Sequence, residues 1–101
     1  MSKVIEVAKF KLNEGVDVEV FLQASEEFNA NFVSIQSGYI TRNLVQENDV
    51  WADIVEWESM EDAVNCGRAM SGNGHIKNYM VCMKMESVEV NRFTAIRTYM
   101  K

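Results

Sequence analysis

With 101 residues, the chain is long enough for one domain with a real but thin hydrophobic core. Hydrophobic residues make up 48% of it, yet no apolar run approaches the roughly 18 residues that cross a bilayer, and the N-terminus lacks a signal-peptide core. We therefore expect a cytoplasmic protein without membrane contact. The formal net charge of −5 and the scattered basic residues disfavour nucleic acid as a partner, because phosphate neutralisation dominates that affinity.

Apolar and polar residues alternate from Val4 to Leu12, which predicts a first strand, and residues 13–15 predict a turn. Asp17 is typical of a helix N-cap. A helix from about Asp17 to Gln36 is predicted, and Gly38 is expected to end it. The stripe that this helix would bury has spacings of three and four and comprises Phe21, Ala24, Phe28, Phe32 and Ile35.

A second strand is predicted over residues 39–46, and residues 47–49 predict a hairpin turn into a third strand over residues 50–58. Successive side chains of a strand point to opposite faces. One face of the third strand would carry Trp51, Asp53, Val55 and Trp57, and the other Val50, Ala52 and Ile54. Because both faces are largely apolar, both need a cover, and one layer of helices can supply only one.

Ser59 is expected to cap a second helix, with Asp62 three positions later in a capping-box-like arrangement. Residues 71–74 are expected to break that helix, and a short third helix should end near Met83. The apolar positions of the two helices are Met60, Ala63, Val64, Gly67, Met70, Ile76, Tyr79, Met80 and Met83. The methionines fit core filling, or else a deformable pocket wall. Ser87 to Met100 predicts the last strand.

The order of these elements is β-α-β-β-α-(short α)-β, which predicts a single α+β domain over residues 1–101. It is the ferredoxin-like plan, a four-stranded antiparallel sheet with the helices on one face. The other sheet face would remain apolar. Its simplest cover is a second copy of the chain, so we expect a homodimer with the sheets face to face.

The two cysteines, Cys66 and Cys82, form no CxxC motif. We expect them to be reduced thiols that pack as small hydrophobes. With a single histidine, the chain offers no common zinc ligand set, so neither a metal nor a cofactor is expected.

A family resemblance extends over almost the whole chain, from about Val4 to Ile96. The residues that carry it are Phe10-Lys11-Leu12, Gly15, Phe21, Phe28, Gly38-Tyr39, Trp51 to Ser59, Glu61-Asp62-Ala63 and a short helix ending near Met83. In this pattern the chain resembles the dimeric α+β barrel superfamily, in particular domains of the antibiotic biosynthesis monooxygenase type. That family includes cofactor-free monooxygenases of quinols and polyketides and relatives that bind or degrade haem, so the resemblance implies the fold and a dimer, with an oxygenase as one activity.

Trp57 is the first candidate site residue, because an aromatic side chain can stack on a flat substrate and exclude water; alternatively, Trp51 and Trp57 fill the core or the dimer interface. Asp53 shares their face. Partly desolvated, it could act as the base for a phenolic proton, or it could pair with Arg42 or Arg92 across strands.

His75 is the only histidine and lies at the start of the short third helix, where its side chain could border a pocket or lie in solvent. In the haem-degrading relatives a late-helix histidine is the axial ligand and pairs with an asparagine on the first strand. Here no asparagine precedes Asn13, which disfavours haem degradation. Asn43 and Asn91 lie in strands, where asparagine is uncommon, and either could reach a pocket or mark an edge or bulge.

Together with these candidates, the resemblance implies a cofactor-independent monooxygenase of a small aromatic or quinol-type substrate, with Trp57, Asp53, His75 and Asn43 as the catalytic candidates. One small pocket per subunit is expected between the sheet and the helices. The alternatives are a non-enzymatic protein that binds a small hydrophobic molecule, with haem among the ligands to consider, and a purely structural dimer.

Overall fold

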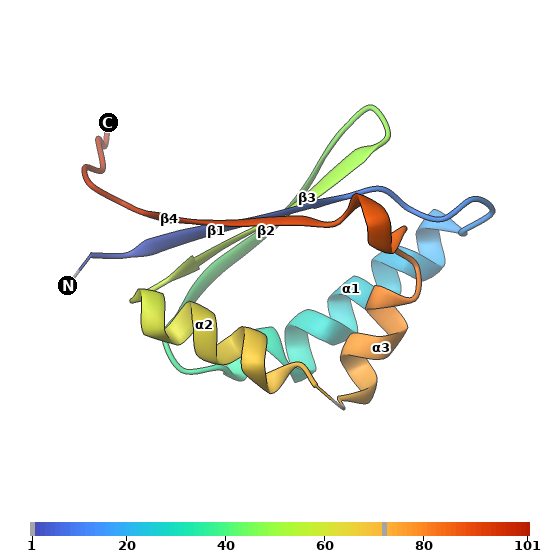
Figure 1. The fold of residues 1–101 in the computed structure, drawn as a ribbon, viewed down its shortest axis with the longest axis horizontal. Helices are drawn as coiled ribbons and strands as arrows, with labels where there is room; N and C mark the ends of the chain where they lie inside the picture. Colours follow the sequence, from blue (N-terminus) through green and yellow to red (C-terminus); the bar gives the residue numbers. More distant parts are fainter. Residues whose placement is uncertain (1, 72) are drawn as a thin grey trace.

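The computed structural model describes residues 2–71 and 73–101. It consists of one antiparallel sheet and a layer of helices. Its strands are β1 (Val4–Phe10), β2 (Tyr39–Glu47), β3 (Val50–Trp57) and β4 (Glu89–Thr94), in the order β2-β3-β1-β4. The helices α1 (Val18–Asn31), α2 (Met60–Ala69) and α3 (Gly74–Met80) all lie on one side of it (Figure 1). The predicted ferredoxin-like architecture is therefore confirmed. None of the helices in the described ranges is long and apolar enough to cross a membrane.

The strand register shows which apolar face of β3 meets the helices. Val4 of β1 lies opposite Trp57 and Phe10 lies opposite Trp51, and all four side chains are buried. The set that contains both tryptophans and Asp53 therefore faces the helices. Val50, Ala52 and Ile54 belong to the opposite, open face, beside the exposed side chains of Ile5, Val45 and Phe93.

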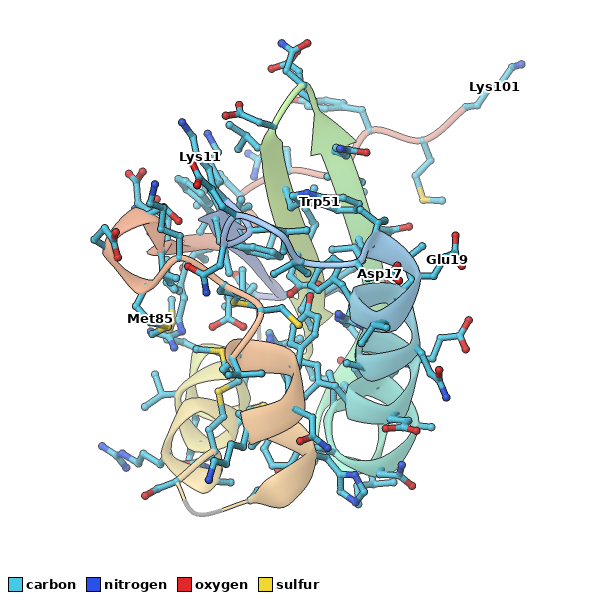
Figure 2. All side chains as sticks on the ribbon, turned by 90° about the vertical axis from the view of Figure 1, so that its right-hand side faces the viewer. Lys11, Asp17, Glu19, Trp51, Met85 and Lys101 are labelled. Carbon is cyan, nitrogen blue, oxygen red and sulfur yellow. The ribbon has the colours of Figure 1, made fainter. Side chains whose placement is uncertain are left out.

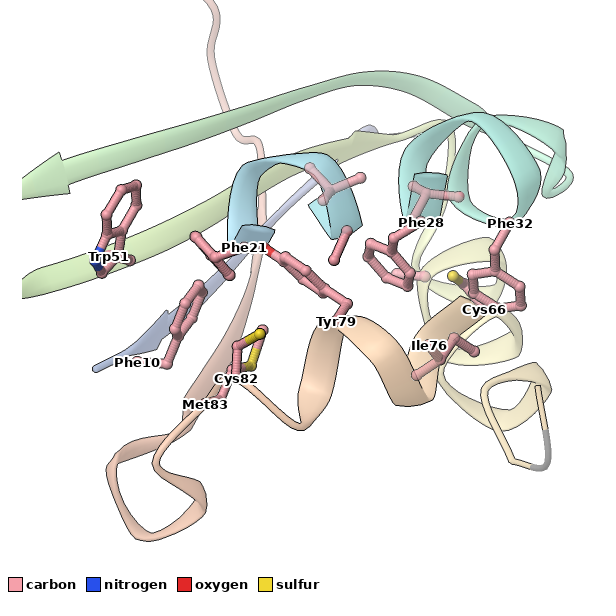
Figure 3. Close-up of a cluster of buried hydrophobic side chains, with 14 of the residues drawn as sticks. Phe10, Phe21, Phe28, Phe32, Trp51, Cys66, Ile76, Tyr79, Cys82 and Met83 are labelled. Atoms are coloured by element: carbon pink, nitrogen blue, oxygen red, sulfur yellow. The ribbon is translucent and has the colours of Figure 1, made fainter. Parts of the chain in front are cut away.

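Aromatic side chains connect the helices to the sheet (Figure 3). The ring of Tyr79 on α3 stacks on Phe28 at a centroid distance of 4.7 Å and on Phe21 at 5.3 Å, both from α1. Phe21 also meets Trp51 of β3 edge-on at 5.1 Å, and Trp51 lies between the sheet and α1 in Figure 2. Offset and edge-to-face aromatic pairs add stability beyond the area they bury. They fix α1 and α3 against one end of the sheet.

The first helix is shorter than predicted. It ends at Asn31, and after Phe32 the 3₁₀ turn η1 covers Val33–Ile35. This break lets both Phe32 and Val33 enter the core, and it turns Ile35, which was expected on the buried stripe, out to 71% exposure. Gly38 therefore does not end the helix. It adopts φ +82° in the turn before β2, where a Cβ atom would collide with the side chain of Asp62.

Two strand predictions were too long. β1 ends at Phe10, and Leu12 makes only an isolated bridge to Met83, which itself lies beyond the end of α3. The 3₁₀ turn η2 (Met85–Ser87) precedes β4, and β4 ends at Thr94, because its pairing partner β1 begins at Val4. Residues 95–101 continue as a non-strand segment that projects away from the helices, with Lys101 at its tip (Figure 2).

Helix starts follow the predicted capping chemistry. The carboxylate of Asp17 accepts a hydrogen bond from the Glu19 backbone N–H at 2.9 Å. The Ser59 hydroxyl accepts one from the Asp62 backbone N–H at 3.1 Å and donates to the Asp62 carboxylate at 2.8 Å. Such caps satisfy N–H groups that a helix leaves free in its first turn. They set the positions where α1 and α2 begin over the sheet.

Candidate functional site

A cavity of about 120 Å³ lies between the sheet and the helices, at the place where a pocket was predicted. It exists because small side chains, among them Ala8 on β1 and Cys66 on α2, occupy positions between large aromatic ones. Its wall is almost entirely apolar. The lining residues are Glu6, Ala8, Phe10, Phe28, Val33, Arg42, Asp53, Val55, Trp57, Cys66, Met70, Tyr79, Met80, Met83, Val88 and Val90.

Asp53 is the central polar residue of the cavity. Its Oδ1 accepts a hydrogen bond from Arg42 Nε at 2.9 Å and forms an ion pair with Arg42, whose Nη2 lies 2.8 Å away. Its Oδ2 accepts a hydrogen bond from the Tyr79 hydroxyl at 2.7 Å. β3, β2 and α3 thus each contribute one member of a buried cluster. Of the two arginines considered as cross-strand partners, the structure places Arg42 against Asp53.

Arg42 has further partners that hold it in place. Its Nη2 donates to the Ser25 hydroxyl at 2.8 Å and to the Tyr79 hydroxyl at 3.0 Å, and its Nη1 donates to the Ser25 carbonyl at 3.3 Å. The guanidinium carbon also lies 5.2 Å from the centre of the Phe28 ring and 5.3 Å from that of Tyr79. A buried arginine requires several hydrogen-bond acceptors, and aromatic faces stabilise its charge further. The cation is therefore enclosed within the core.

Burial alters the proton affinities of this cluster. Loss of water raises the pKa of the Asp53 carboxyl; Arg42 and the Tyr79 hydrogen bond oppose the shift only partly, and the charge of Glu6 adds to it. Burial, with the nearby charge of Asp53, also raises the pKa of the Tyr79 hydroxyl. A carboxyl with a raised pKa is a better proton acceptor than an exposed one. The cavity thus contains a carboxylate that can serve as a base.

A second carboxylate borders the cavity. Glu6 on β1 accepts a hydrogen bond from Trp57 Nε1 through Oε1 at 3.3 Å, and its Oε2 pairs with Arg92 Nε on β4 at 2.6 Å. Cys66 lies close enough that burial and the charge of Glu6 raise the pKa of its thiol to about 11. This thiol is therefore protonated at neutral pH and packs as an apolar side chain. Both cysteines are free and buried.

The structure brings together two of the four predicted catalytic residues. Trp57 and Asp53 both line the cavity. Asn43 belongs to the open face, in one row across the sheet with Ile54, Val7 and Asn91. His75, at the start of α3, is exposed and does not line the cavity, and its backbone N–H donates to the Asn73 side chain. Neither asparagine nor the histidine can therefore contact a molecule in the cavity in this conformation.

Sequence reasoning missed Glu6 and Tyr79 as site residues and considered Arg42 only as a partner of Asp53. Glu6 had a detectable signal, because it is a charged residue on the otherwise apolar face of the first strand. Tyr79 looked like any apolar helical position, since a phenol ring fits a core and its hydroxyl partner lies 26 positions away. Met70, Met80 and Met83 all line the cavity, as the alternative of a methionine-rich pocket wall requires.

Among the described residues, no three or more His, Cys, Asp or Glu side chains are grouped so that they could hold a metal ion. The polar side chains that line the cavity are instead the Arg42–Asp53 pair, the Glu6 carboxylate, the Tyr79 phenol and the Trp57 indole. These groups can accept, donate and move protons.

No protein-family model matches the sequence, and no curated protein matches it either. Solved structures share the fold. The N63A mutant of SnoaB from Streptomyces nogalater, a protein named as a cofactor-independent oxygenase, is 20% identical to this chain. The two structures match with a TM-score of 0.75 over 97% of both chains. A candidate antibiotic biosynthesis monooxygenase from Bordetella bronchiseptica is 15% identical, with a TM-score of 0.78 over 96% of this chain and 100% of that one.

A further structure of the same architecture is named as a dimeric ferredoxin-like protein from an uncultured marine organism. It is 12% identical, with a TM-score of 0.72 over 100% of this chain and 94% of that one. The expected resemblance to antibiotic biosynthesis monooxygenase-like proteins is thus confirmed at the level of the fold. A shared fold does not determine the reaction, which depends on the residues of the cavity.

Proposed function

We propose that the protein is a cofactor-independent monooxygenase of a small aromatic, quinol-type substrate that binds in the cavity. The observation that carries this proposal is the position of Asp53, a carboxyl of raised pKa in the wall of an almost wholly apolar cavity. An aromatic ring matches the apolar wall, and an ionisable hydroxyl on that ring matches the carboxylate. The names of the fold neighbours point to the same reaction type.

The reaction begins when the substrate hydroxyl gives its proton to Asp53, which leaves a phenolate-type anion. This anion transfers one electron to O₂, and the resulting radical pair joins through a new carbon–oxygen bond. The peroxide that forms on a ring carbon still bearing hydrogen takes the proton back from Asp53. The resulting hydroperoxide then loses water, which breaks the C–H and O–O bonds at that carbon and leaves a carbonyl. One oxygen atom enters the product quinone and the other leaves as water, so O₂ takes up four electrons from the substrate. Trp57 and Phe28 would enclose the ring and exclude water.

Oxygen uptake with a panel of small phenols and quinols tests the activity. We expect turnover above the protein-free rate for at least one of them, and a loss of at least about tenfold in Asp53→Asn, the magnitude of general base catalysis. Asp49→Asn, the same change in the exposed hairpin, is the matched control and should keep wild-type turnover. Rates no higher than those without protein, or equal rates in wild type, D53N and Trp57→Ala, would contradict the proposal.

A second candidate is a protein that binds an aromatic molecule without reacting. It is favoured by the way in which Arg42, Asp53 and Tyr79 satisfy one another's hydrogen bonds, which leaves an apolar surface toward the cavity. Titration under anaerobic conditions separates the two functions. Binding without oxygen uptake supports this candidate, whereas binding with uptake supports the oxygenase.

A homodimer completes the proposal. The open face of the sheet carries a concavity of about 550 Å³ with Val7, Val45, Val50, Ala52 and Ile54 in its wall, and water does not favour such a face. A second copy covers it with the same apolar residues. At micromolar concentration we expect a sedimentation mass of twice 11.6 kDa, and a clean monomer would contradict the dimer. The proposed compartment of the protein is the cytoplasm.

A further inference from the structure

The indole of Trp57 is buried but incompletely packed. The residue is 1% exposed, and yet it lines the cavity, so part of its ring borders empty space. Tyr39 supports the indole edge-on, with the ring centroids 6.2 Å apart. A side chain beside a void lacks, on that side, the contacts that would otherwise fix its rotamer. Packing alone therefore does not determine how the ring lies in the cavity wall.

One hydrogen bond supplies the orientation that packing does not. Trp57 Nε1 donates to Glu6 Oε1 at 3.3 Å, and among the described residues the indole makes no other hydrogen bond. A buried N–H that loses its acceptor keeps the full penalty of having left water. The ring is therefore most stable in the orientation in which its N–H meets the Glu6 carboxylate.

The sheet register brings the carboxylate to the indole. Glu6 of β1 lies opposite Val55 of β3, and Trp57 follows two positions after Val55, so Glu6 and Trp57 are diagonal neighbours on one face. Diagonal side chains of an antiparallel pair are within reach of each other when one of them is aromatic or long. The contact therefore follows from the pairing of two adjacent strands and does not depend on how the helices pack.

Arg92 holds the carboxylate from the neighbouring strand. It lies directly opposite Glu6 on β4, and its Nε donates to Glu6 Oε2 at 2.6 Å. Because Arg92 uses Oε2 and the Trp57 indole uses Oε1, the two contacts do not compete. The three side chains form one row from the edge strand to the cavity, and Glu6 is fixed at both of its oxygens.

We propose that Glu6 is a positioning residue, which acts on a ligand through Trp57 by holding the indole as a fixed part of the cavity wall. A rigid wall favours binding, because a mobile side chain that the ligand has to order lowers the affinity. The indole takes no part in the proton transfer, so in turnover the loss of Glu6 should raise KM and leave kcat nearly unchanged. The inference rests on the proposed function for the place where the ligand binds, but its first test needs no ligand.

The first test is an NMR spectrum of the indole N–H groups, in which each of the two tryptophans gives one signal. In Glu6→Leu, which removes the acceptor and keeps a side chain of similar size, we expect the Trp57 signal to move upfield. Trp51, at the opposite end of β3, is the internal control, and its signal should stay in place. Glu6→Gln keeps one acceptor oxygen and should retain the wild-type signal of Trp57. Glu56→Leu, the same change as Glu6→Leu but on the open face, is the matched control and should move neither signal.

The second test is an anaerobic titration of wild type and these variants with phenol. We expect E6L to bind phenol about three- to tenfold more weakly, the cost of ordering one side chain, while E6Q and Glu56→Leu stay within about twofold of wild type. Arg92→Ala removes only the side chain that holds Glu6, at the sheet edge. It should move the Trp57 signal in the same direction by a smaller amount, so the contact can be tested even if E6L does not fold.

Three results would overturn the inference: an unchanged Trp57 signal in the folded variants, equal movement of both tryptophan signals, or a moved Trp57 signal with unchanged affinity for phenol. The expected changes in signal and affinity, without oxygen uptake by wild type, would leave the inference standing and overturn the oxygenase. Oxygen uptake by wild type with an unchanged Trp57 signal in E6L would do the reverse.

Discussion

Two arginine–carboxylate pairs flank the same cavity, and they differ mainly in burial. Arg42 and Asp53 have side chains that are 6% and 10% exposed, whereas Arg92 and Glu6 are 34% and 14% exposed. Arg42 is covered by Ser25 of α1 and Tyr79 of α3. Both pairs join neighbouring strands, so the helices that cover them make the difference.

Arg92 belongs to β4, at an edge of the sheet under α2. A Cβ atom on Gly67 of α2 would lie 3.2 Å from Arg92 Nη2, so the glycine lets the guanidinium lie along the helix without enclosing it. The buried Arg42–Asp53 pair is a structural element of the core, because neither side chain can reach water unless the core unfolds locally. A pair at the edge can rearrange at lower cost, because water reaches Arg92.

The largest effect is expected from removing one member of the buried pair. Asp53→Ala leaves the Arg42 guanidinium and the Tyr79 hydroxyl without their acceptor inside the core. Breaking a buried pair in this way costs about 3–5 kcal/mol of unfolding free energy. Glu6→Ala leaves Arg92 in contact with water but removes the acceptor of the buried Trp57 indole N–H, and it should cost less, about 1–3 kcal/mol. Urea unfolding of both variants tests the difference, and equal losses would show that burial does not separate the two pairs.

The same contrast explains what the sequence could predict. Alternation along residues 50–58 showed that Trp51, Asp53, Val55 and Trp57 share a face, and capping residues located the starts of the helices. The alternation could not show which face of the strand meets the helices, because the face with Val50, Ala52 and Ile54 is as apolar as the face with the tryptophans. That choice depends on how α1 and α3 pack, a property of the whole fold.

The site was harder to predict than the fold, because it is assembled from distant segments. The site combines Ser25 of α1, Arg42 of β2 and Tyr79 of α3, and no local spacing in the sequence predicts that they are in contact. Asn43 was a reasonable candidate by residue type. A strand alternates its faces, however, so its neighbour Arg42 points into the cavity and Asn43 points to the open face.

An intermediate effect is expected in the pH dependence of stability. The Asp53 carboxyl titrates near its ordinary pKa of 3.8 in the unfolded chain and at a higher pKa in the folded one, so the folded state binds more protons between those two values. Its contribution to stability is therefore fully present below pH 3.8 and is lost as the pH rises through the folded pKa. The loss amounts to about 1.4 kcal/mol for every pH unit that separates the folded pKa from the unfolded one. The difference in unfolding free energy between wild type and Asp53→Asn should thus fall as the pH rises above 3.8. Parallel curves for the two proteins would contradict this.

The smallest effect is expected from salt. In 1 M NaCl the screening length shrinks to about 3 Å, from about 10 Å at 0.1 M, and screening acts mainly on charges that water can reach. The cost of Glu6→Gln should therefore decrease by a few tenths of a kcal/mol at high salt, because Arg92 is one-third exposed. The cost of Asp53→Asn should not change, since Arg42 is enclosed by Phe28, Tyr79 and Ser25. Unfolding free energies of the two variants at both salt concentrations measure this, each referred to wild type in the same buffer. If both costs decreased alike, water would have to reach Arg42, and the buried pair would be as open to exchange as the pair at the sheet edge.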